Sequence, residues 1–232
     1  MNLPDTGIDH LVVMADHLES GVRWCQDTLG VVPAPGGEHP LMGTHNRLIN
    51  ISSAAHPRAY LEIIAIHPAA AARPARARWF DMDDAALQAR VARDGPQWIH
   101  WVASVRDVAA AHASLAAHGI DRGEVITASR PTPLGLLQWQ ITVRPDGQRL
   151  MGGCLPTLIQ WGDRHPCYSL PASGVQLQSL QLNHPDAPAL AAACAAIGFS
   201  AQIAVSPAAA PGLQALLSTP SGPVTLGASE AA

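Results

Sequence analysis

The sequence predicts an α+β protein made of three consecutive strand–helix–strand units. Short apolar strands alternate with segments of helical periodicity, and a glycine follows each expected helix. The spacing between one strand position and that glycine is nearly constant: 20 residues from His10 to Gly30, 19 from His100 to Gly119 and 21 from Leu177 to Gly198. Such a spacing is typical of an internal repeat. We therefore expect a first module at 1–92, a second at 93–170 and a shorter third at 171–232.

Each unit is expected to contain its elements in a similar order. The first comprises a strand at 7–15, a helix at 18–29 capped by Asp16, a loop opened by Gly36 and Gly37, and strands at 43–51 and 59–66. A short helix near 83–93 leads to the second, which has a strand at 97–105, a helix at 108–118 capped by Asp107, and strands at 135–143 and 155–161. The third has a strand at 175–182, a helix at 187–197 and short strands near 213–218 and 224–226.

The composition excludes several classes of function. The 232 residues are 48% hydrophobic, which is enough for a substantial core, and the formal net charge of -4 is spread without blocks. This distribution predicts neither a nucleic-acid surface nor an acidic tail. All 14 basic residues are arginines, so a Schiff-base lysine and a Walker-type phosphate loop are both excluded.

The cysteines and the apolar runs indicate where the protein resides. None of the four cysteines, Cys25, Cys154, Cys167 and Cys194, has CxxC spacing, and no basic-then-apolar leader opens the chain. The apolar runs end well before the roughly 18 residues that a membrane span needs. We expect reduced thiols in a cytoplasmic protein that does not enter a membrane.

One polar side chain interrupts an apolar face in each of four expected strands. These side chains are His10, Glu62, His100 and Gln160. A buried Glu62 carboxylate is costly unless a cation or hydrogen bonds compensate it. Two imidazoles, a carboxylate and an amide oxygen suit Fe, Mn, Zn, Ni or Co as a divalent ion, whereas histidine ligands argue against Mg and Ca. We therefore predict a divalent metal site, in which the neutral amide of Gln160 is the weakest ligand.

A purely structural interpretation competes with this prediction. A single histidine in an apolar strand is more often a hydrogen-bonded core residue than a metal ligand. The metal interpretation is favoured because the four residues fall on the first and last strands of two successive units. Leu177 occupies the equivalent position of the third unit, which is therefore not expected to form a site of its own.

The four strands resemble those that carry the metal ligands in the vicinal oxygen chelate superfamily. The stretches concerned are Ile8-Asp-His-Leu-Val-Val, Tyr60-Leu-Glu-Ile-Ile-Ala-Ile, Trp98-Ile-His-Trp-Val and Leu158-Ile-Gln-Trp. Three others are similar to a glyoxalase-like branch of that superfamily: Gly43-Thr-His-Asn-Arg-Leu-Ile, Arg78-Trp-Phe and Gln160-Trp-Gly-Asp-Arg-His-Pro166. The resemblance implies tandem βαβββ modules whose curved mixed sheet surrounds a metal cavity. It also implies that the ligands are His10, Glu62, His100 and Gln160.

The resemblance further implies a reaction type. In this superfamily a small substrate with adjacent oxygens chelates the metal, which acts as a Lewis acid. Glyoxalase I-like proteins have a glutamate base at the position of Gln160, and an amide cannot take a proton, so Glu62 is the general base expected here. The leading expectation is a glyoxalase-like lyase or isomerase.

Two alternatives remain open from the sequence. An extradiol-type dioxygenase uses two histidines and a glutamate, a composition matched here, but with the glutamate on the other module. A non-catalytic small-molecule binding or resistance protein would have no need of the His/Glu/His set. The expected partners are a small-molecule substrate and, through the third unit, a second copy of the chain.

Further residues are expected near the cavity. The candidates for substrate binding are His45, Asn46 and Arg47, which follow a glycine-rich loop, and Trp139 in the second unit. His67-Pro68 and His165-Pro166 each come five residues after an expected ligand. We interpret both dipeptides as structural turns.

Overall fold

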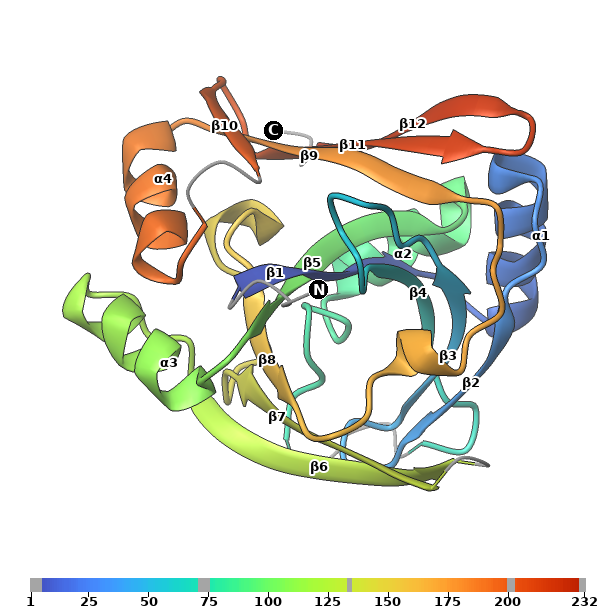
Figure 1. Cartoon of the computed structure of the whole chain (residues 1–232), viewed down its shortest axis with the longest axis horizontal. Helices are drawn as coiled ribbons and strands as arrows, with labels where there is room; N and C mark the ends of the chain where they lie inside the picture. Colours follow the sequence, from blue (N-terminus) through green and yellow to red (C-terminus); the bar gives the residue numbers. More distant parts are fainter. Residues whose placement is uncertain (1–5, 71–75, 133–134, 200–202, 230–232) are drawn as a thin grey trace.

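The computed structural model describes residues 6–70, 76–132, 135–199 and 203–229. These residues form two β-sheets with helices packed around them, which confirms the predicted α+β class (Figure 1). No helix within the described ranges is long and apolar enough to cross a membrane. All four cysteines are free thiols.

The larger sheet has eight strands in the order β2-β3-β4-β1-β5-β8-β7-β6. Its centre is the antiparallel pair β1 and β5, which joins the first predicted module to the second. In each half the first strand pairs in parallel with the last, β1 with β4 and β5 with β8. Figure 1 shows these strands curving around a central space. Their bounds are β1 (Thr6–Met14), β2 (Ala34–His39), β3 (Thr44–Asn50), β4 (Tyr60–Ile66), β5 (Gln97–Val105), β6 (Glu124–Thr132), β7 (Gly135–Val143) and β8 (Thr157–Trp161).

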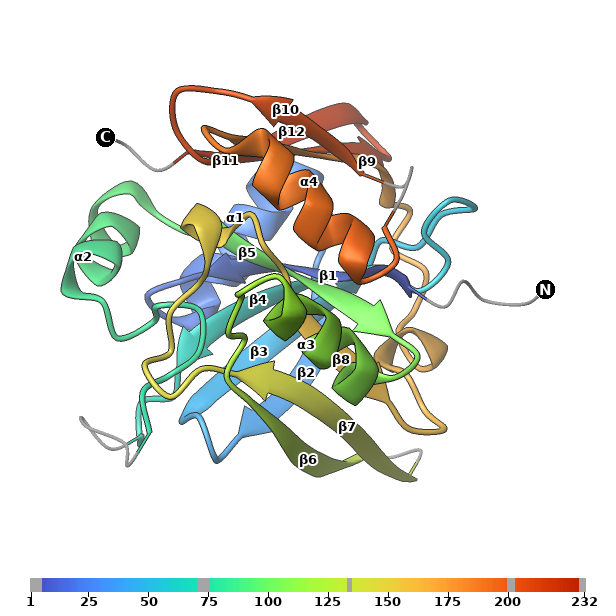
Figure 2. The same ribbon diagram turned by 90° about the vertical axis from the view of Figure 1, so that its left-hand side faces the viewer.

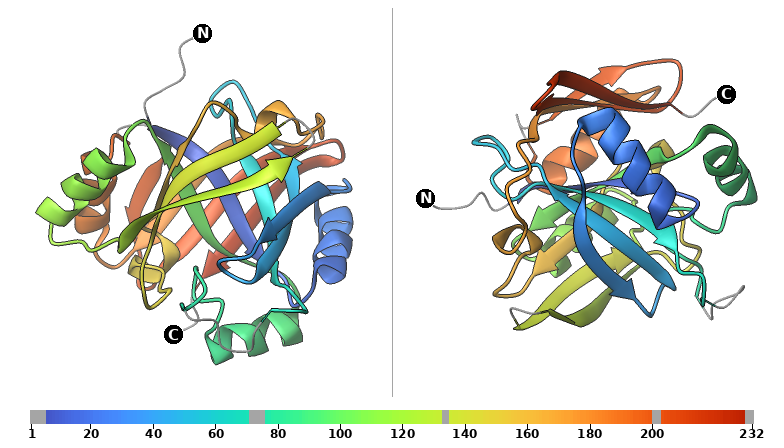
Figure 3. Two further views of the ribbon diagram at one scale, coloured as in Figure 1. Left: turned by 90° about the horizontal axis from the view of Figure 1, so that it is seen from below. Right: turned by 90° about the vertical axis from the view of Figure 1, so that its right-hand side faces the viewer.

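The smaller sheet has four strands in the order β10-β9-β11-β12 and lies on the outer side of β1 and β5 (Figures 1, 2 and 3). Its strands are β9 (Gln176–His184), β10 (Ala204–Pro207), β11 (Gly212–Thr219) and β12 (Gly222–Ser229). The third unit repeats the element order of the first two, but here the first strand pairs in parallel with the second, β9 with β10, and not with the last. Its buried leucines pack with buried apolar side chains of β1 and β5 in one core.

The helices follow the first strand of each unit or connect the first two units. They are α1 (Leu18–Leu29), α2 (Ala85–Asp94), α3 (Val108–Ala117) and α4 (Ala187–Ala196), with short 3-10 turns at η1 (Met151–Gly153) and η2 (Pro166–Tyr168). Gly30 ends α1 in the left-handed conformation, as expected. The predicted cap of α1 is wrong, because the His17 side chain accepts the hydrogen bond from the Ser20 amide. Asp16 instead accepts the hydrogen bond of the Ser20 hydroxyl.

Three strands have no counterpart in the sequence prediction: β2, β6 and β10. Strand β2 contains Pro35, Gly36 and Gly37, residues that usually signal a loop, and its pairing with β3 is irregular between Pro35 and Glu38. Strands β2 and β6 are the two edges of the large sheet. An edge strand tolerates glycine and proline because half of its backbone needs no ladder partner.

Irregular pairing in β1 and β5 changes which side chains share a face. A register shift between Ile8 and His10 places Ile8 in the outer core, whereas regular alternation predicts it on the same face as His10. A second shift places Trp98 in the outer core as well, whereas regular alternation predicts it on the same face as His100. The shift in β1 brings the Asp9 carboxylate onto the His10 ring.

Candidate functional site

The larger sheet encloses a cavity of about 410 Å³. Most of its wall is apolar or aromatic, and most of the polar groups come from β1, β2, β3 and β4. The lining residues are His10, His39, Asn46, Leu48, Tyr60, Glu62, Trp79, Phe80, Arg130, Leu137, Trp139, Ile141, Ile159, Trp161 and Pro166.

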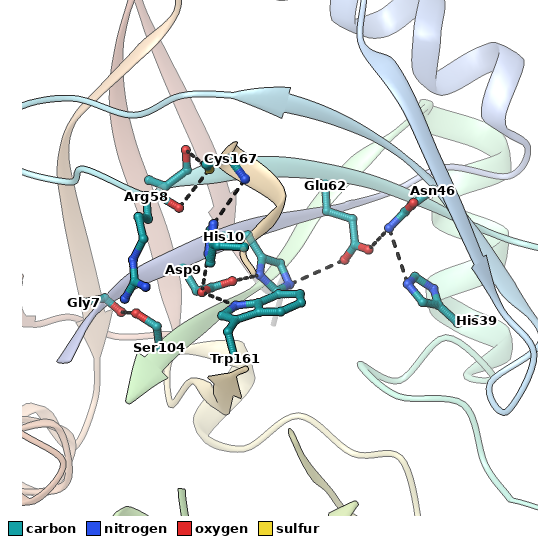
Figure 4. Close-up of polar contacts among 12 residues, drawn as sticks. Gly7, Asp9, His10, His39, Asn46, Arg58, Glu62, Ser104, Trp161 and Cys167 are labelled. Atoms are coloured by element: carbon teal, nitrogen blue, oxygen red, sulfur yellow. Dashed lines mark hydrogen bonds and ion pairs between the residues drawn. The ribbon is translucent and has the colours of Figure 1, made fainter. Parts of the chain in front are cut away.

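Asp9 holds the His10 ring in place from behind (Figure 4). The Asp9 Oδ1 lies 2.7 Å from His10 Nδ1, and its Oδ2 accepts hydrogen bonds from Trp161 Nε1 at 2.8 Å and His165 Nε2 at 3.2 Å. Burial opposes ionisation of Asp9, but the charge of His165 and the hydrogen bonds from the two imidazoles outweigh it and lower its pKa. An ionised carboxylate only accepts hydrogen bonds, so Nδ1 of His10 carries the proton. The Nε2 atom of His10 is thereby directed at the cavity.

Glu62 faces His10 across the cavity wall. Its Oε2 is 3.6 Å from His10 Nε2, and both side chains are almost fully buried. The other carboxylate oxygen, Oε1, accepts a 2.5 Å hydrogen bond from Asn46 Nδ2. Asn46 is oriented in turn by the Gly37 amide, which donates to its Oδ1 at 2.8 Å. Figure 4 shows the resulting row from Asp9 through His10 and Glu62 to Asn46.

Two glycines of β2 allow this arrangement by lacking a side chain. A Cβ on Gly36 would lie 2.0 Å from Asn46 Oδ1, and a Cβ on Gly37 would lie 2.0 Å from Arg130 Nη1. Both distances are far below van der Waals contact. The site therefore requires Gly36 and Gly37, which the sequence analysis assigned to a loop, because their lack of a side chain lets Asn46 and Arg130 approach the strand.

His39 and Tyr60 complete the polar side of the cavity as uncharged groups. Burial lowers the pKa of His39 from its usual 6.5 to about 3. Its Nε2 is 3.5 Å from Asn46 Nδ2 and its Nδ1 is 3.1 Å from Thr44 Oγ1. Burial also raises the pKa of Tyr60 well above its usual value, and the Tyr60 ring stacks on His10 with 4.5 Å between centroids.

His100 lies outside the cavity lining and its ring nitrogens are occupied. Its Nε2 accepts from the Thr157 amide at 3.2 Å and its Nδ1 is 3.1 Å from the Gly153 carbonyl oxygen. The ring is fully buried against Phe80. Burial, followed by the nearby charges of Arg122 and Arg149, lowers its pKa well below 6.5. His100 is therefore a neutral, hydrogen-bonded core residue in this arrangement.

Gln160 points away from the cavity, toward helix α3. Its Oε1 accepts a 2.9 Å hydrogen bond from the Val108 amide, the first residue of that helix. The β8 side chains that line the cavity are its neighbours Ile159 and Trp161. The strand pairing explains why Gln160 and Glu62 point in different directions. Glu62 lies opposite Val12 of β1, and Thr157 lies opposite Val102, which is the matching residue of β5. Glu62 therefore corresponds to Thr157 in this sheet.

The four expected metal ligands do not meet at one point. Among the residues that the structure describes, no group of three or more histidine, cysteine, aspartate or glutamate side chains is arranged to hold a metal ion. His100 and Gln160 are engaged by the protein itself through the hydrogen bonds to Thr157 and Val108. The set therefore does not fit one ion in this arrangement, and only His10 and Glu62 face each other closely enough to share one.

The expected substrate-binding residues divide between the two faces of the sheet. Asn46 and Trp139 line the cavity. His45 and Arg47 alternate with Asn46 along β3 and lie on the opposite face, where the His45 ring contacts His67 with 4.8 Å between centroids. Burial and the neighbouring His67 lower the pKa of His45.

Several residues of the site have no role in the sequence prediction: Asp9, His39, Tyr60, Arg130, Trp161 and His165. Regular alternation predicts Asp9 on the face opposite His10, and the register shift in β1 overturns that assignment. His165 does form a turn, since its Nδ1 accepts from the Cys167 amide at 3.2 Å, but its other nitrogen also contacts Asp9. In the sequence, the adjacency of Asp9 and His10 is the feature that could have indicated their contact.

The fold and the site together define a class: a tandem βαβββ protein with a cavity inside its curved sheet. The family described as "Glyoxalase-like domain" matches residues 8–198, most of the chain. This protein therefore belongs to the glyoxalase-like family, and the resemblance to the vicinal oxygen chelate superfamily is confirmed. A search of curated proteins gave no match.

Comparison with solved structures gives matches at low sequence identity. A hypothetical protein from Staphylococcus aureus is 14% identical with a TM-score of 0.57, covering 97% of this chain and 86% of that one. A variant of Streptomyces coelicolor methylmalonyl-CoA epimerase in complex with 2-nitronate-propionyl-CoA is 18% identical with a TM-score of 0.40, covering 68% and 96%. Methylmalonyl-CoA epimerase from Mycobacterium tuberculosis is 16% identical with a TM-score of 0.39, covering 69% and 91%.

Proposed function

We propose that the protein is a lyase- or isomerase-type enzyme that moves a proton on a small oxygenated metabolite bound in the cavity. The observation that carries the proposal is the enclosed pair of His10 Nε2 and Glu62 Oε2, 3.6 Å apart and each held from behind by a second side chain. A carboxylate and an imidazole are the side chains that most often transfer protons in enzymes. Glu62 acts as the general base, the role also expected from the sequence.

The chemistry uses both members of the pair. Glu62 takes a proton from a carbon next to a carbonyl group, and the electron pair moves onto the carbonyl oxygen to give an enolate. His10, when protonated, donates from Nε2 to that oxygen, while Asp9 stabilises the imidazolium through Nδ1. The oxygen keeps the His10 proton to give an enediol, and the now neutral His10 takes the hydroxyl proton from the deprotonated carbon. Glu62 then returns its proton to the former carbonyl carbon, which isomerises a 2-hydroxy carbonyl substrate. Burial of both side chains strengthens each of these interactions.

Hydrogen–deuterium exchange tests this proposal even while the product is unidentified. A panel of small 2-hydroxy and 2-oxo carbonyl compounds is incubated with the protein in deuterated water, and loss of the carbon-bound proton is followed by proton NMR. Glu62→Gln is expected to slow the enzyme-dependent exchange by about 100-fold or more. Exchange that is equally fast in Glu62→Gln and the parent protein would contradict the role of Glu62.

The alternative hypothesis is a divalent metal centre on His10, Glu62, His100 and Gln160. Measurement of the metal content distinguishes this centre from proton transfer by the His10–Glu62 pair alone. Protein purified without chelators is analysed for Fe, Mn, Zn, Ni and Co, alongside His10→Ala and His100→Ala. Proton transfer by the His10–Glu62 pair predicts exchange that is insensitive to chelators. One equivalent of ion that is lost equally in both variants would support the four-ligand centre and a rearranged sheet.

A further inference from the structure

The inner cavity adjoins an outer chamber that carries positive charge. The chamber has a volume of about 640 Å³ and shares Leu48, Arg130, Leu137 and Pro166 with the inner cavity. Its lining contains two arginines, Arg130 and Arg164, and no aspartate or glutamate.

Arg130 stands at the junction of the two spaces with an unused donor. Its Nη1 atom is buried and has no hydrogen-bond partner among the residues that the structure describes. A buried guanidinium N–H without an acceptor is costly, and such groups are normally satisfied by a carboxylate or phosphate. The guanidinium reaches this position only because Gly37, on the facing edge strand, has no side chain.

The other polar groups of the inner cavity do not compete with Arg130 for an anion. The pKa of His39 is lowered to about 3 by burial and by the nearby Arg130, so this ring is neutral at physiological pH. Glu62 repels an anionic group and directs it toward Arg130. The charges therefore fix one orientation for an elongated substrate.

We infer that the substrate is an organic oxyanion, whose carboxylate or phosphate binds Arg130 at the chamber junction while its reacting carbon lies at the His10–Glu62 pair. The inference rests on the proposed function for the reacting end and adds the chemical class of the other end. Arg164, which is exposed at the chamber rim, contributes a weaker, screened attraction.

Binding of simple probes tests the anion site independently of turnover. Succinate, methyl phosphate and the neutral analogue succinamide are titrated at low ionic strength and followed by the fluorescence of the cavity tryptophans. Succinate or methyl phosphate is expected to saturate the parent protein, and succinamide is not. The tighter of the two anions identifies a carboxylate or a phosphate as the natural group. Equal binding of succinamide and the anions would overturn the inference.

Three arginine variants locate the site. Arg130→Gln is expected to weaken anion binding by about 10-fold or more, with Arg130→Lys intermediate because a lysine keeps the charge without the bidentate geometry. Arg164→Gln should have an effect of a few-fold. Arg93→Gln, which removes an exposed arginine paired with Asp94 on α2, is the matched control and should change binding less than about two-fold. An equal loss in Arg130→Gln and Arg93→Gln would overturn the assignment.

The same variants keep the two proposals distinguishable. Glu62→Gln should abolish exchange and leave the binding of succinate or methyl phosphate intact or improved, because it removes a repelling charge. If Arg130→Gln loses anion binding but no compound on the panel exchanges, the anion site stands and the proposed reaction fails. If anionic compounds exchange with a KM that Arg130→Gln leaves unchanged, the reaction stands and the anion site fails.

Discussion

The two halves of the large sheet place equivalent histidines in different environments. His10 and His100 occupy matching positions of β1 and β5, and in each the Nδ1 atom faces an acceptor, Asp9 or the Gly153 carbonyl oxygen. The Nε2 atom of His10 is directed at Glu62 and the cavity, whereas that of His100 accepts from the Thr157 amide. The Nε2 atom of one histidine therefore faces the cavity, whereas that of the other takes part in a hydrogen bond with the backbone.

The difference follows from one residue at the matching register of the last strand. Glu62 extends a carboxylate that stays in contact with the cavity, while Thr157 is short enough for His100 to reach its backbone amide and is covered by Arg122. Phe80 then fills the space over His100. A repeat that supplies two copies of a histidine therefore yields one site and one core contact.

The largest effect that separates the halves should come from His100→Ala. This change removes a fully buried ring, leaves the Thr157 amide and Gly153 carbonyl without partners and opens a cavity, so we expect a loss of about 3 kcal/mol in the free energy of unfolding. His10→Ala should cost less stability but abolish exchange. Urea denaturation measures the first effect, with the exposed His118→Ala as control. A larger stability loss in His10→Ala would reverse the comparison.

Asp9→Asn should have the next largest effect, in the half that contains His10 and Glu62. The carboxylate holds three buried donors, so its neutral replacement is expected to cost about 2 kcal/mol at pH 7 and to slow exchange through misalignment of His10. The folded-state pKa of Asp9 is lowered, so its contribution is present above the unfolded pKa of about 3.9 and is lost as pH falls below it. Urea melts at pH 7 and pH 3 should show the difference shrinking.

The helix-capping carboxylate Asp107 provides a matched control for that experiment. Asp107→Asn makes the same chemical change at an exposed N-cap, where asparagine still accepts the hydrogen bond of the Ala110 amide. It should leave exchange unchanged. An equal fall of exchange in both variants would argue against a positioning role for Asp9.

The neutral buried histidines predict a pH dependence that both halves share. His39 and His100 have lowered pKa values in the folded protein, so below about pH 6.5 the unfolded chain binds protons that the folded chain does not. Each contributes a fall in unfolding free energy of up to about 1.4 kcal/mol per pH unit as pH drops from about 6 to about 5. His39→Gln should reduce this slope in urea melts at several pH values. An unchanged slope would show that His39 is protonated in the folded protein.

Gln160→Ala should have the smallest effect and sharpens the comparison with the sequence prediction. The amide oxygen caps the Val108 N–H of α3, so its loss is expected to cost about 1 kcal/mol in unfolding free energy with no change in exchange. Circular dichroism melts and the NMR assay measure the two quantities. A loss of exchange comparable to that of Glu62→Gln would show that Gln160 takes part in the reaction.

Alternation and capping were enough to find most elements, because they depend on neighbouring residues alone. The expected range of β5 coincides with the observed strand, and Asp107 caps α3 as expected. Strand β2 could not be found in this way, since Gly36 and Gly37 serve side chains that arrive from β3 and β6. The Asp9 carboxylate was missed for a similar reason: a register shift depends on the partner strand.

The sequence by itself determined the repeated α+β architecture, the family and the importance of His10 and Glu62 as polar groups on an apolar face. Only the tertiary structure decided which residues meet them. The pairing of β5 with β8 placed Thr157 rather than Gln160 at the position matching Glu62, and the curvature of the sheet brought Arg130 to Gly37. Side-chain period is a local property, whereas register and closure are set by contacts between strands distant in the chain.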